Sequence, residues 1–447
     1  MMAQGSELRR LLKLAIPVIL SQLGNISMGL VDTYVVAKAG SVELSGVAAG
    51  NGLFWPIILI AIGLLLGIDT IVSQSFSRKD HKTVAACLGL GLLSSAVISL
   101  FFGVIIFALS QNLESFGINR DIALRAEPYL EILAWSTPLL VFFNCFQKYW
   151  QACELALPIT VLIVFANIVN YFLDEAFVLG KWGFPALGAE GVAYSTLYCR
   201  VFLMAAILLI SFYFWKKSPR YHRPSLHELK SFDKALARQF YKLSVPAASQ
   251  IGLEVFAFNI VTIIAATLTP TDLSAHHIVL NIATATFMVP MGISIATSIR
   301  VGSHWGARRY HKAAQVSYLG TGLGAAVMLG FAGLLYSLPQ ELIGIFTKEA
   351  EVIKLGTGII GLCALFQVVD GIQICAGGAL RGMGNAKTSL YANTFGHYVI
   401  GLPLSMFTCF YLDWHLQGLW TGLALGLCIV AIINSLKLRQ TNRAHAL

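Results

Sequence analysis

The residues of this sequence best suited to chemistry are a few ionisable side chains set within long apolar segments. An ionised side chain near the centre of a bilayer costs on the order of 3 kcal/mol on insertion scales, so such residues are rarely idle. A buried carboxylate can bind a cation when it is ionised, or carry a proton when burial favours its neutral form. The ionisable residues within apolar segments are Asp32, Asp174, Glu175, Arg200, Glu254, Asp370 and His397. The acids among them predict sites that alternate between two charge states.

The segments that carry these residues are long and apolar enough to cross a membrane. Apolar residues make up 57% of the chain and charged residues only 12%, and the mean hydropathy of +0.72 lies far outside the range of soluble proteins. A transmembrane helix needs about 20 apolar residues. We therefore expect an all-α integral membrane protein with twelve transmembrane helices. The predicted spans are residues 13–37, 47–76, 84–110, 124–148, 157–179, 188–215, 240–266, 273–300, 313–338, 351–378, 388–412 and 416–436.

The second half of the chain repeats the first at an offset of 229 to 230 residues. Lys13 and Pro17, for example, recur as Lys242 and Pro246, and six predicted spans fall in each half. Repeated halves in the same orientation are a common way for transporters to build an alternating-access site. The predicted division is an N-terminal six-helix lobe of residues 1–215, a cytoplasmic linker of residues 216–239 and a C-terminal six-helix lobe of residues 240–447.

The distribution of basic residues predicts the orientation in the membrane. Most of the 31 Lys and Arg residues flank the spans on one side, which the positive-inside rule assigns to the cytoplasm. We therefore expect a multi-pass protein of the cytoplasmic (inner) membrane with both termini in the cytoplasm. The net charge of +9 is spread over many such loops rather than gathered in one patch, so nucleic acid is not an expected partner.

Other classes of function lack the residues that they need. The eight cysteines lie in or beside apolar segments without a C-x-x-C pair, so neither disulfides nor structural zinc are expected. No G-x-x-x-x-G-K-[ST] loop is present for nucleotide hydrolysis. A membrane-embedded enzyme would need His, Asp and Glu clustered at the rim of the membrane. We therefore expect neither enzyme activity nor a cofactor, and transport that is either passive or driven by an ion gradient.

Several motifs are spread over both halves of the chain. In the first half they are Pro17, Gln22, Val31-Asp32-Thr33-Tyr34, Gly63, Gly67, Gln74, Asn170, Asp174 and Gly188-Ala-Glu-Gly191. In the second half they are Pro246, Glu254, Pro290, Gly292, Arg300-Val-Gly302, Gly306 and Leu380-Arg-Gly-Met-Gly384. From about Leu11 to the last span the chain thus resembles the multidrug and toxic compound extrusion (MATE) family, in its NorM-type branch. The resemblance implies the MATE fold of two pseudo-symmetric six-helix bundles, and efflux of organic cations and amphiphilic drugs by alternating access in exchange for Na⁺ or H⁺.

The same resemblance implies a cation site in each half of the chain. Asn170 and Asp174 share a helix face because they are four residues apart. Gln250 lies one turn before Glu254, and Asp370 comes from another helix, so the titrations of these two acids are expected to couple. Hard oxygens suit Na⁺, whereas a desolvated carboxylate suits H⁺. The predicted cation-coupling residues are Asp32, Asn167, Asn170, Asp174, Thr196, Gln250, Glu254 and Asp370, with Na⁺ expected either at Asp32, Asn170 and Asp174 or at Glu254 and Asp370.

Aromatic side chains in spans that should border a central cleft are candidates for the substrate site. A flat organic cation can stack on an aromatic ring. The predicted substrate-binding residues are Trp55, Phe142, Phe256, Phe287 and Phe366. The expected partners are small-molecule drugs and the lipid bilayer, and the expected assembly is a monomer.

The main alternative is a lipid-linked precursor flippase of the same superfamily. Such a protein would hold a pyrophosphate with several basic residues, whereas Arg200 is the one Lys or Arg that lies within a predicted span away from its ends. Arg200 also departs from the family pattern, and Asp174 and Glu175 are the expected partners for its charge. Pairing with Asp32 would instead put the first cation site in doubt. Uptake of an organic solute is a further alternative, because both directions of transport share a fold.

Overall fold

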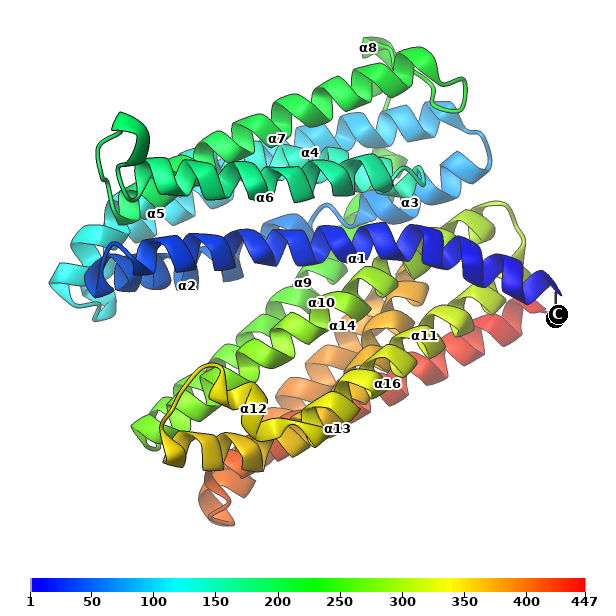
Figure 1. Ribbon diagram of the computed structural model, residues 1–447. Coiled ribbons are helices and arrows are strands. Elements are labelled where there is room, and N and C mark those ends of the chain that lie inside the picture. The colour runs from blue at the N-terminus through cyan, green and yellow to red at the C-terminus, as the bar shows by residue number, and fades with distance from the viewer. Residues whose placement is uncertain (1, 447) are drawn as a thin grey trace. The chain divides into compact units, whose positions relative to one another are not determined.

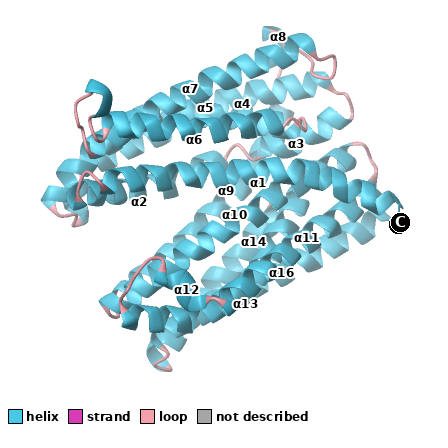
Figure 2. Ribbon diagram, viewed as in Figure 1, coloured by secondary structure: helices cyan, strands magenta, loops and turns pink. Residues whose placement is uncertain are grey.

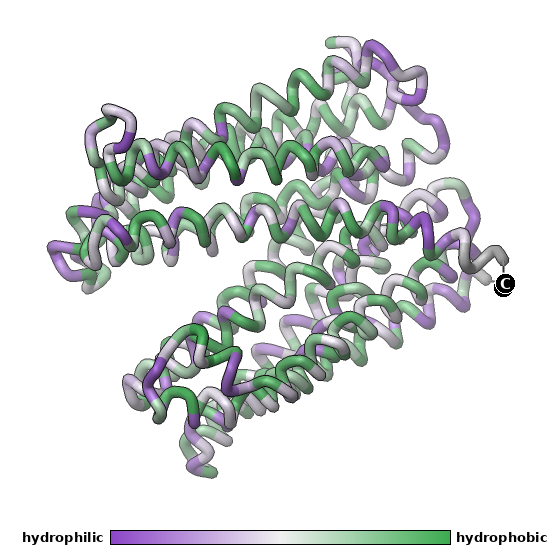
Figure 3. Tube along the Cα trace, viewed as in Figure 1, coloured by the Kyte–Doolittle hydropathy of each residue, from purple (hydrophilic) through white to green (hydrophobic). Residues whose placement is uncertain are grey.

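The described part of the chain is helical throughout. The computed structural model describes the backbone of residues 2–446 and the side chains of residues 6–445. Within these residues every regular element is a helix and none is a strand (Figure 2). Hydrophobic residues fill the long helices, and hydrophilic residues gather mainly at their ends and in the turns (Figure 3). The prediction of an all-α integral membrane protein is confirmed.

The chain forms two compact units. The N bundle comprises Leu23–Ser244, and the C bundle comprises the chain from Val245 onward together with the segment up to Gln22. Two long helices, α1 (Met2–Ala37) and α9 (Lys234–Ala266), pass from one unit to the other. This division differs from the predicted lobes, because the connecting residues 216–239 belong to the N bundle and the beginning of α1 belongs to the C bundle.

The N bundle is built around one central helix, α5 (Arg120–Ala152). Its other main helices are α2 (Ser41–Gly63), α3 (Gly67–Ser77), α4 (His81–Ser110), α6 (Leu157–Phe177) and α7 (Ala189–Lys217), and its short ones are η1 (Leu113–Phe116), η2 (Lys181–Gly183) and α8 (Leu226–Leu229) (Figure 1). The central helix packs against α2, α3, α4 and α7, and α6 packs against α7. Side-chain caps fix two of the helix starts, since Asp80 accepts the Thr83 N–H at α4 and Asn119 accepts the Asp121 N–H at α5.

The C bundle repeats this plan around α13 (Ala350–Gly382). Its other elements are α10 (Pro270–Gly306), α11 (Tyr310–Ser337), α12 (Pro339–Gly344), α14 (Lys387–Asn393), η3 (Thr394–Gly401), α15 (Leu402–Met406), η4 (Phe407–Tyr411) and α16 (His415–Ala446). The helix α13 packs against α10, α11 and α16. The bounds of α13 are those of α5 moved by 230 residues, so the internal repeat places the same helix at the centre of each bundle.

The second predicted span, residues 47–76, is two helices rather than one. The N–H of Leu66 donates to the carbonyl of Gly63, three residues back, which tightens the turn between α2 and α3. The N–H of Gly67, which opens α3, donates to the hydroxyl of Ser244 at 3.0 Å. This bond holds the start of α3 against α9, and no hydrophobic pattern could have predicted it.

The eleventh predicted span, residues 388–412, is helical but is not a single α-helix. The elements α14, η3, α15 and η4 follow one another without a break, and η3 and η4 are π-helical. Gly396 packs closely on α16, because a Cβ there would meet the Gly426 carbonyl oxygen at 2.6 Å. Eleven further helical segments of the described chain are long and apolar enough to cross a membrane. With this segment they make up the twelve predicted spans in two bundles.

Candidate functional site

Three of the residues predicted for the first cation site meet in the N bundle. The side-chain amide of Asn170 donates to Asp32 Oδ1 at 2.6 Å and to Asp174 Oδ2 at 2.9 Å. Asn170 and Asp174 lie one turn apart on α6, and Asp32 comes from α1. The hydroxyl of Ser195 on α7 donates to Asp174 Oδ1. Three helices therefore converge on one pair of acids.

The two acids of the N bundle form one buried pair. Asp32 and Asp174 are both buried, and the side-chain amide of Asn170 donates to one oxygen of each. Two ionised carboxylates held this way repel each other in an apolar interior, so a cation that offsets part of their charge stabilises the pair.

Further oxygens on the helices α6 and α7 are unused. Asn170 Oδ1, Asn167 Oδ1 and Thr196 Oγ1 are buried, and none has a hydrogen-bond partner within the described chain. Buried polar atoms of this kind are normally satisfied, so three on the helices that carry Asp174 and Ser195 require a reason. Carboxylate, amide and hydroxyl oxygens are the hard ligands that an alkali cation accepts. The donor set predicted from the sequence therefore fits Na⁺ as well as a proton.

Arg200 lies near this acid pair but makes no close ion pair with it. Its guanidinium donates to the hydroxyl of Ser136 on α5 and lies 5.2 Å from the centre of the Phe54 ring. The residue is buried on α7, five residues after Ser195, whose hydroxyl donates to Asp174. Arg200 therefore contributes a buried positive charge to the site without occupying a carboxylate oxygen.

The expectation that Arg200 pairs with Asp174 or Glu175 is wrong. Among residues 6–445 the structure records no ion pair between Arg200 and either acid. Glu175 instead lies 2.7 Å from Lys181 Nζ and 4.0 Å from Lys38 Nζ. The reason is geometric: Glu175 pairs with basic residues beyond the ends of α1 and α6, whereas Arg200 points into the bundle toward α5.

The C bundle contains a second acid pair of similar construction. The side-chain amide of Gln373 donates to Asp370 Oδ1 at 3.0 Å and to Glu254 Oε1 at 3.4 Å. Asp370 and Gln373 come from the central helix α13, and Glu254 comes from α9. Gln250, one turn before Glu254, is buried, and its Oε1 has no partner in the described chain. One amide thus joins two acids in this bundle too.

Arg381 is the basic residue of this second site. It lies in the last turn of α13, its guanidinium donates to Ser294 Oγ at 3.1 Å, and its charge acts on Glu254. Arg381 lies in the Leu380–Gly384 motif but was not among the predicted site residues. Gln373 was also missed, although its spacing of three from Asp370 places both on one helix face. Ser195 and Ser136 carry no sequence signal that separates them from other serines.

The predicted substrate-binding aromatics differ in exposure. Phe256 is 50% exposed and Trp55 is 38% exposed, and Phe142 and Phe287 are partly buried. Phe366 is buried in the C bundle, where its ring lies edge-on to Phe258 and Trp420 at centroid distances of 6.1 and 6.2 Å. A substrate cannot reach Phe366 without rearrangement of this core.

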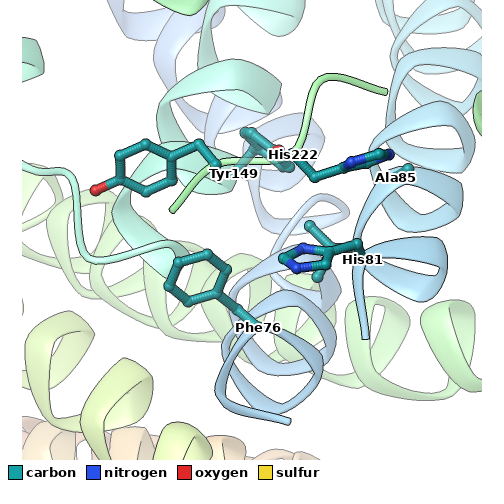
Figure 4. A pocket seen from close by; sticks show the side chains of 7 residues that line it. Phe76, His81, Ala85, Tyr149 and His222 are labelled. Carbon is teal, nitrogen blue, oxygen red and sulfur yellow. The ribbon is translucent and has the colours of Figure 1, made fainter. Parts of the chain in front are cut away.

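A separate small pocket lies in the N bundle beside α8. Figure 4 shows its wall, which includes Phe76, His81, Ala85, Tyr149 and His222. The two histidine rings lie 5.4 Å apart. A volume of about 10 Å³ has room for roughly one water molecule. This pocket is therefore too small for an organic substrate.

Known proteins resemble the chain along most of its length. The sequence model of the MatE family matches residues 17–175 and 246–407. A probable multidrug resistance protein NorM of Pseudomonas putida is 29% identical over 436 residues, which cover 96% of this chain and 94% of the relative. A probable multidrug resistance protein NorM of Bacillus cereus is 28% identical over 455 residues, which cover 99% and 97%.

The fold has solved counterparts as well. A crystal structure of a MATE protein in the bent conformation matches with a TM-score of 0.89 at 18% identity, and the match covers 99% of this chain and 97% of the other. At this level of identity the likeness concerns the fold, which both chains share from end to end.

Proposed function

The chain belongs to the MatE family, and from that premise we propose that it exports organic cations and other amphiphilic drugs in exchange for Na⁺ or H⁺. Like the other members of the family, it is a membrane transporter and not an enzyme. The observation that carries the proposal is the pair of acids joined by a single amide in each bundle. The multidrug resistance names of the curated relatives support the nature of the substrate.

The proposed exchange follows from the charge of the acid pairs. Two ionised acids inside an apolar bundle are unfavourable, so the pair takes up a cation from whichever side can reach it. An inward-moving Na⁺ or H⁺ and an outward-moving drug cation compete for the same negative charge. Asp32 and Asp174 supply this charge in the N bundle, and Glu254 and Asp370 supply it in the C bundle.

Neutral oxygens complete the proposed cation sites. In the N bundle these are the unused oxygens of Asn167, Asn170 and Thr196. In the C bundle Gln250 and Gln373 each have a buried Oε1 without a partner in the described residues. Each site can therefore bind a proton on a carboxyl group, or Na⁺ between carboxylate and neutral oxygens.

The proposed substrate contacts are the aromatic residues that a ligand can reach. Trp55 and Phe256 offer the largest exposed rings of the predicted set, and Phe142 and Phe287 offer part of theirs. Stacking on such rings holds a flat cation without a fixed hydrogen-bond pattern, which suits a transporter of varied drugs. Phe366 is left out of this set because it is buried.

We place the protein in the cytoplasmic (inner) membrane as a monomer with both termini in the cytoplasm. The basic residues of the connection after α7 support this orientation. Lys216, Lys217, Arg220 and Arg223 are all exposed there, as residues of a cytoplasmic loop would be.

The proposal is tested with purified protein in proteoliposomes loaded with ethidium, to which a Na⁺ gradient and a pH gradient are applied separately. Efflux driven by Na⁺ alone would identify oxygen-ligated Na⁺ as the coupling ion. Efflux driven by pH alone would identify the carboxyl groups as proton carriers. Absence of efflux under both gradients would overturn the proposal and favour a lipid-linked precursor flippase.

A further inference from the structure

The N bundle holds three buried charges that must be considered together. Asp32 and Asp174 are two acids, and Arg200 is one permanent cation beside them. A guanidinium remains protonated in proteins, so its charge cannot be removed by proton loss. With both acids ionised, the cluster carries one negative charge.

Charge balance then fixes how many mobile cations the cluster takes up. A buried cluster with uncompensated charge is unfavourable, and the neutral state is favoured. With Arg200 present, one monovalent cation makes the cluster neutral. Without Arg200, the same two acids would need two.

We propose that Arg200 is a fixed counter-charge that limits the N bundle to one mobile cation in each transport cycle. This inference rests on the proposed exchange of drug for Na⁺ or H⁺, and it adds a stoichiometry to that exchange. Arg200 takes the place of a second coupling ion. It binds neither the drug nor the coupling ion itself. It affects ion binding through its fixed positive charge.

The surroundings of Arg200 leave few other groups to alter this count. From α5, Ser136 accepts its hydrogen bond, and Tyr129 interacts with its charge while donating its own hydroxyl to Asn51 at 2.9 Å. From α2, Phe54 offers an aromatic face. From α1 and α6 come Asp32 and Asp174, which form the pair itself. On α7 the neighbouring thiol of Cys199 donates to a backbone carbonyl, that of Ala166.

The acid on α6 next to the pair belongs to a different charge group. Glu175 is compensated by Lys181 and Lys38. The cluster of Asp32, Asp174 and Arg200 therefore keeps its own charge balance.

The C bundle also contains two acids and one arginine, at positions that the internal repeat does not relate to those of the N bundle. Glu254 and Asp370 are its two acids, and Arg381 is a cation whose charge acts on Glu254. The internal repeat does not relate the two sets, since the repeat equivalents of Asp32, Asp174 and Arg200 are the uncharged Val261, Leu404 and Val430. Two acids and one arginine are thus found in both bundles without descent from one ancestral set.

The test measures the number of ions exchanged per drug in proteoliposomes with the membrane potential clamped at zero. Net transport then stops when the drug concentration ratio across the membrane equals the ion concentration ratio raised to the power of the number of ions exchanged per drug. For a tenfold ion gradient, Arg200→Gln is expected to raise the limiting drug ratio tenfold, because one more cation enters the N bundle. Arg200→Lys, which keeps the charge, and Ser136→Ala, which removes only its hydrogen-bond partner, are expected to keep the wild-type ratio. An unchanged ratio in Arg200→Gln would overturn the proposal.

A second measurement covers the case in which Arg200→Gln does not transport. Protonated carboxyl groups are counted by infrared spectroscopy on the purified proteins at neutral pH in Na⁺-free buffer, so that Na⁺ cannot take the place of a proton. The variant Arg200→Gln/Asp174→Asn identifies the contribution of the pair. Arg200→Gln should show one more protonated carboxyl than wild type, and equal numbers would overturn the proposal. This count needs no drug, so it remains decisive even if wild-type protein fails to export drugs and the proposed function fails.

Discussion

At the scale of residues, the main feature is the single amide that joins two acids. An amide nitrogen has two N–H donors, so Asn170 and Gln373 can each satisfy one oxygen from both acids of a pair. The amide holds the two carboxyl groups at one place although their charges repel. Under the proposed function, each pair therefore binds a cation as a unit.

Replacement of the amide should weaken cation binding more than protein folding. In Asn170→Leu, two buried carboxyl oxygens lose a donor, and a lost hydrogen bond of this kind costs about 1–3 kcal/mol. We expect the apparent affinity for the coupling cation in drug efflux to fall roughly tenfold or more. The measurement is the dependence of ethidium efflux on Na⁺ or H⁺ concentration.

Asn144→Leu is the matched control for this substitution. The Asn144 amide donates to the backbone carbonyl of Leu140 within its own helix and serves no acid. Its efflux curve should match that of wild type. Equal curves for both variants would show that the amide bridge has no role in coupling.

The acids of the two sites could be predicted from the sequence, whereas their partners could not. Asp32, Glu254 and Asp370 are conspicuous because charges are rare in apolar spans. Gln373 and Ser195 are uncharged types that occur in many helices, and only the packing of α13 and α7 brings them to the acids. Arg381 lies near a helix end, where a topological role is the simpler interpretation.

At the scale of elements, hydrophobic length predicts the spans but not their internal breaks. The turn between α2 and α3 and the π-helical elements η3 and η4 occur inside continuous apolar runs. Such breaks depend on close backbone approaches, which glycine permits by lacking a Cβ. The approach of η3 to α16 at Gly396 and Gly426 is of this kind.

A methyl group at this contact should destabilise the C bundle. In Gly426→Ala the new Cβ would meet the Gly396 carbonyl oxygen at 2.6 Å and Gly401 Cα at 2.9 Å. Overpacking of this kind typically costs 1–3 kcal/mol. We expect a lower melting temperature of the detergent-purified protein in a thiol-reactive or chromatographic thermal assay.

Gly330→Ala provides the comparison, because a Cβ at Gly330 in α11 would meet nothing within 4 Å. This substitution should leave the melting temperature unchanged or raise it slightly through higher helix propensity. A melting temperature of Gly426→Ala as high as that of Gly330→Ala would contradict the close contact between η3 and α16.

The short helix α8 should depend on its capping box. Ser225 accepts the Glu228 N–H at 3.2 Å, and the Glu228 carboxylate accepts the Ser225 N–H at 2.8 Å. Ser225→Ala removes a cap that typically contributes about 1 kcal/mol. Amide exchange of residues 226–229 should accelerate several-fold in this variant, and exchange at the wild-type rate would contradict the cap.

The same cap predicts a pH dependence. The Ser225 N–H, His222 and the Ser225 hydroxyl lower the pKa of Glu228 from its ordinary value of 4.5 to about 2. Because the pKa is lower in the folded loop than in the unfolded one, the cap contributes fully above about pH 4.5 and is lost as the pH falls toward about 2. Protection of the α8 amides, measured relative to the intrinsic exchange rate at each pH, should therefore decrease over this acidic interval, and Glu228→Gln should remove the dependence.

At the scale of the whole molecule, the chain is an internal duplication that gives each half its own charged site. The repeat in the sequence predicted two six-helix bundles, and each is built around an equivalent central helix. The functional residues do not follow the repeat, because Asp32 and Glu254 have no acidic equivalent in the other half. The sequence could therefore predict the architecture by comparison of its halves, but each site had to be found separately.

The most direct test of the account is drug efflux by Asp32→Asn and Glu254→Gln in proteoliposomes under the gradient that drives wild-type protein. Each variant keeps the size of its side chain and loses the charge that is proposed to bind the coupling cation. Asp413→Asn, at an exposed acid, is the control. The account predicts normal amounts of both site variants in the membrane and loss of coupled ethidium efflux in each, with wild-type efflux in the control. Wild-type efflux by the variant that carries both substitutions would contradict it.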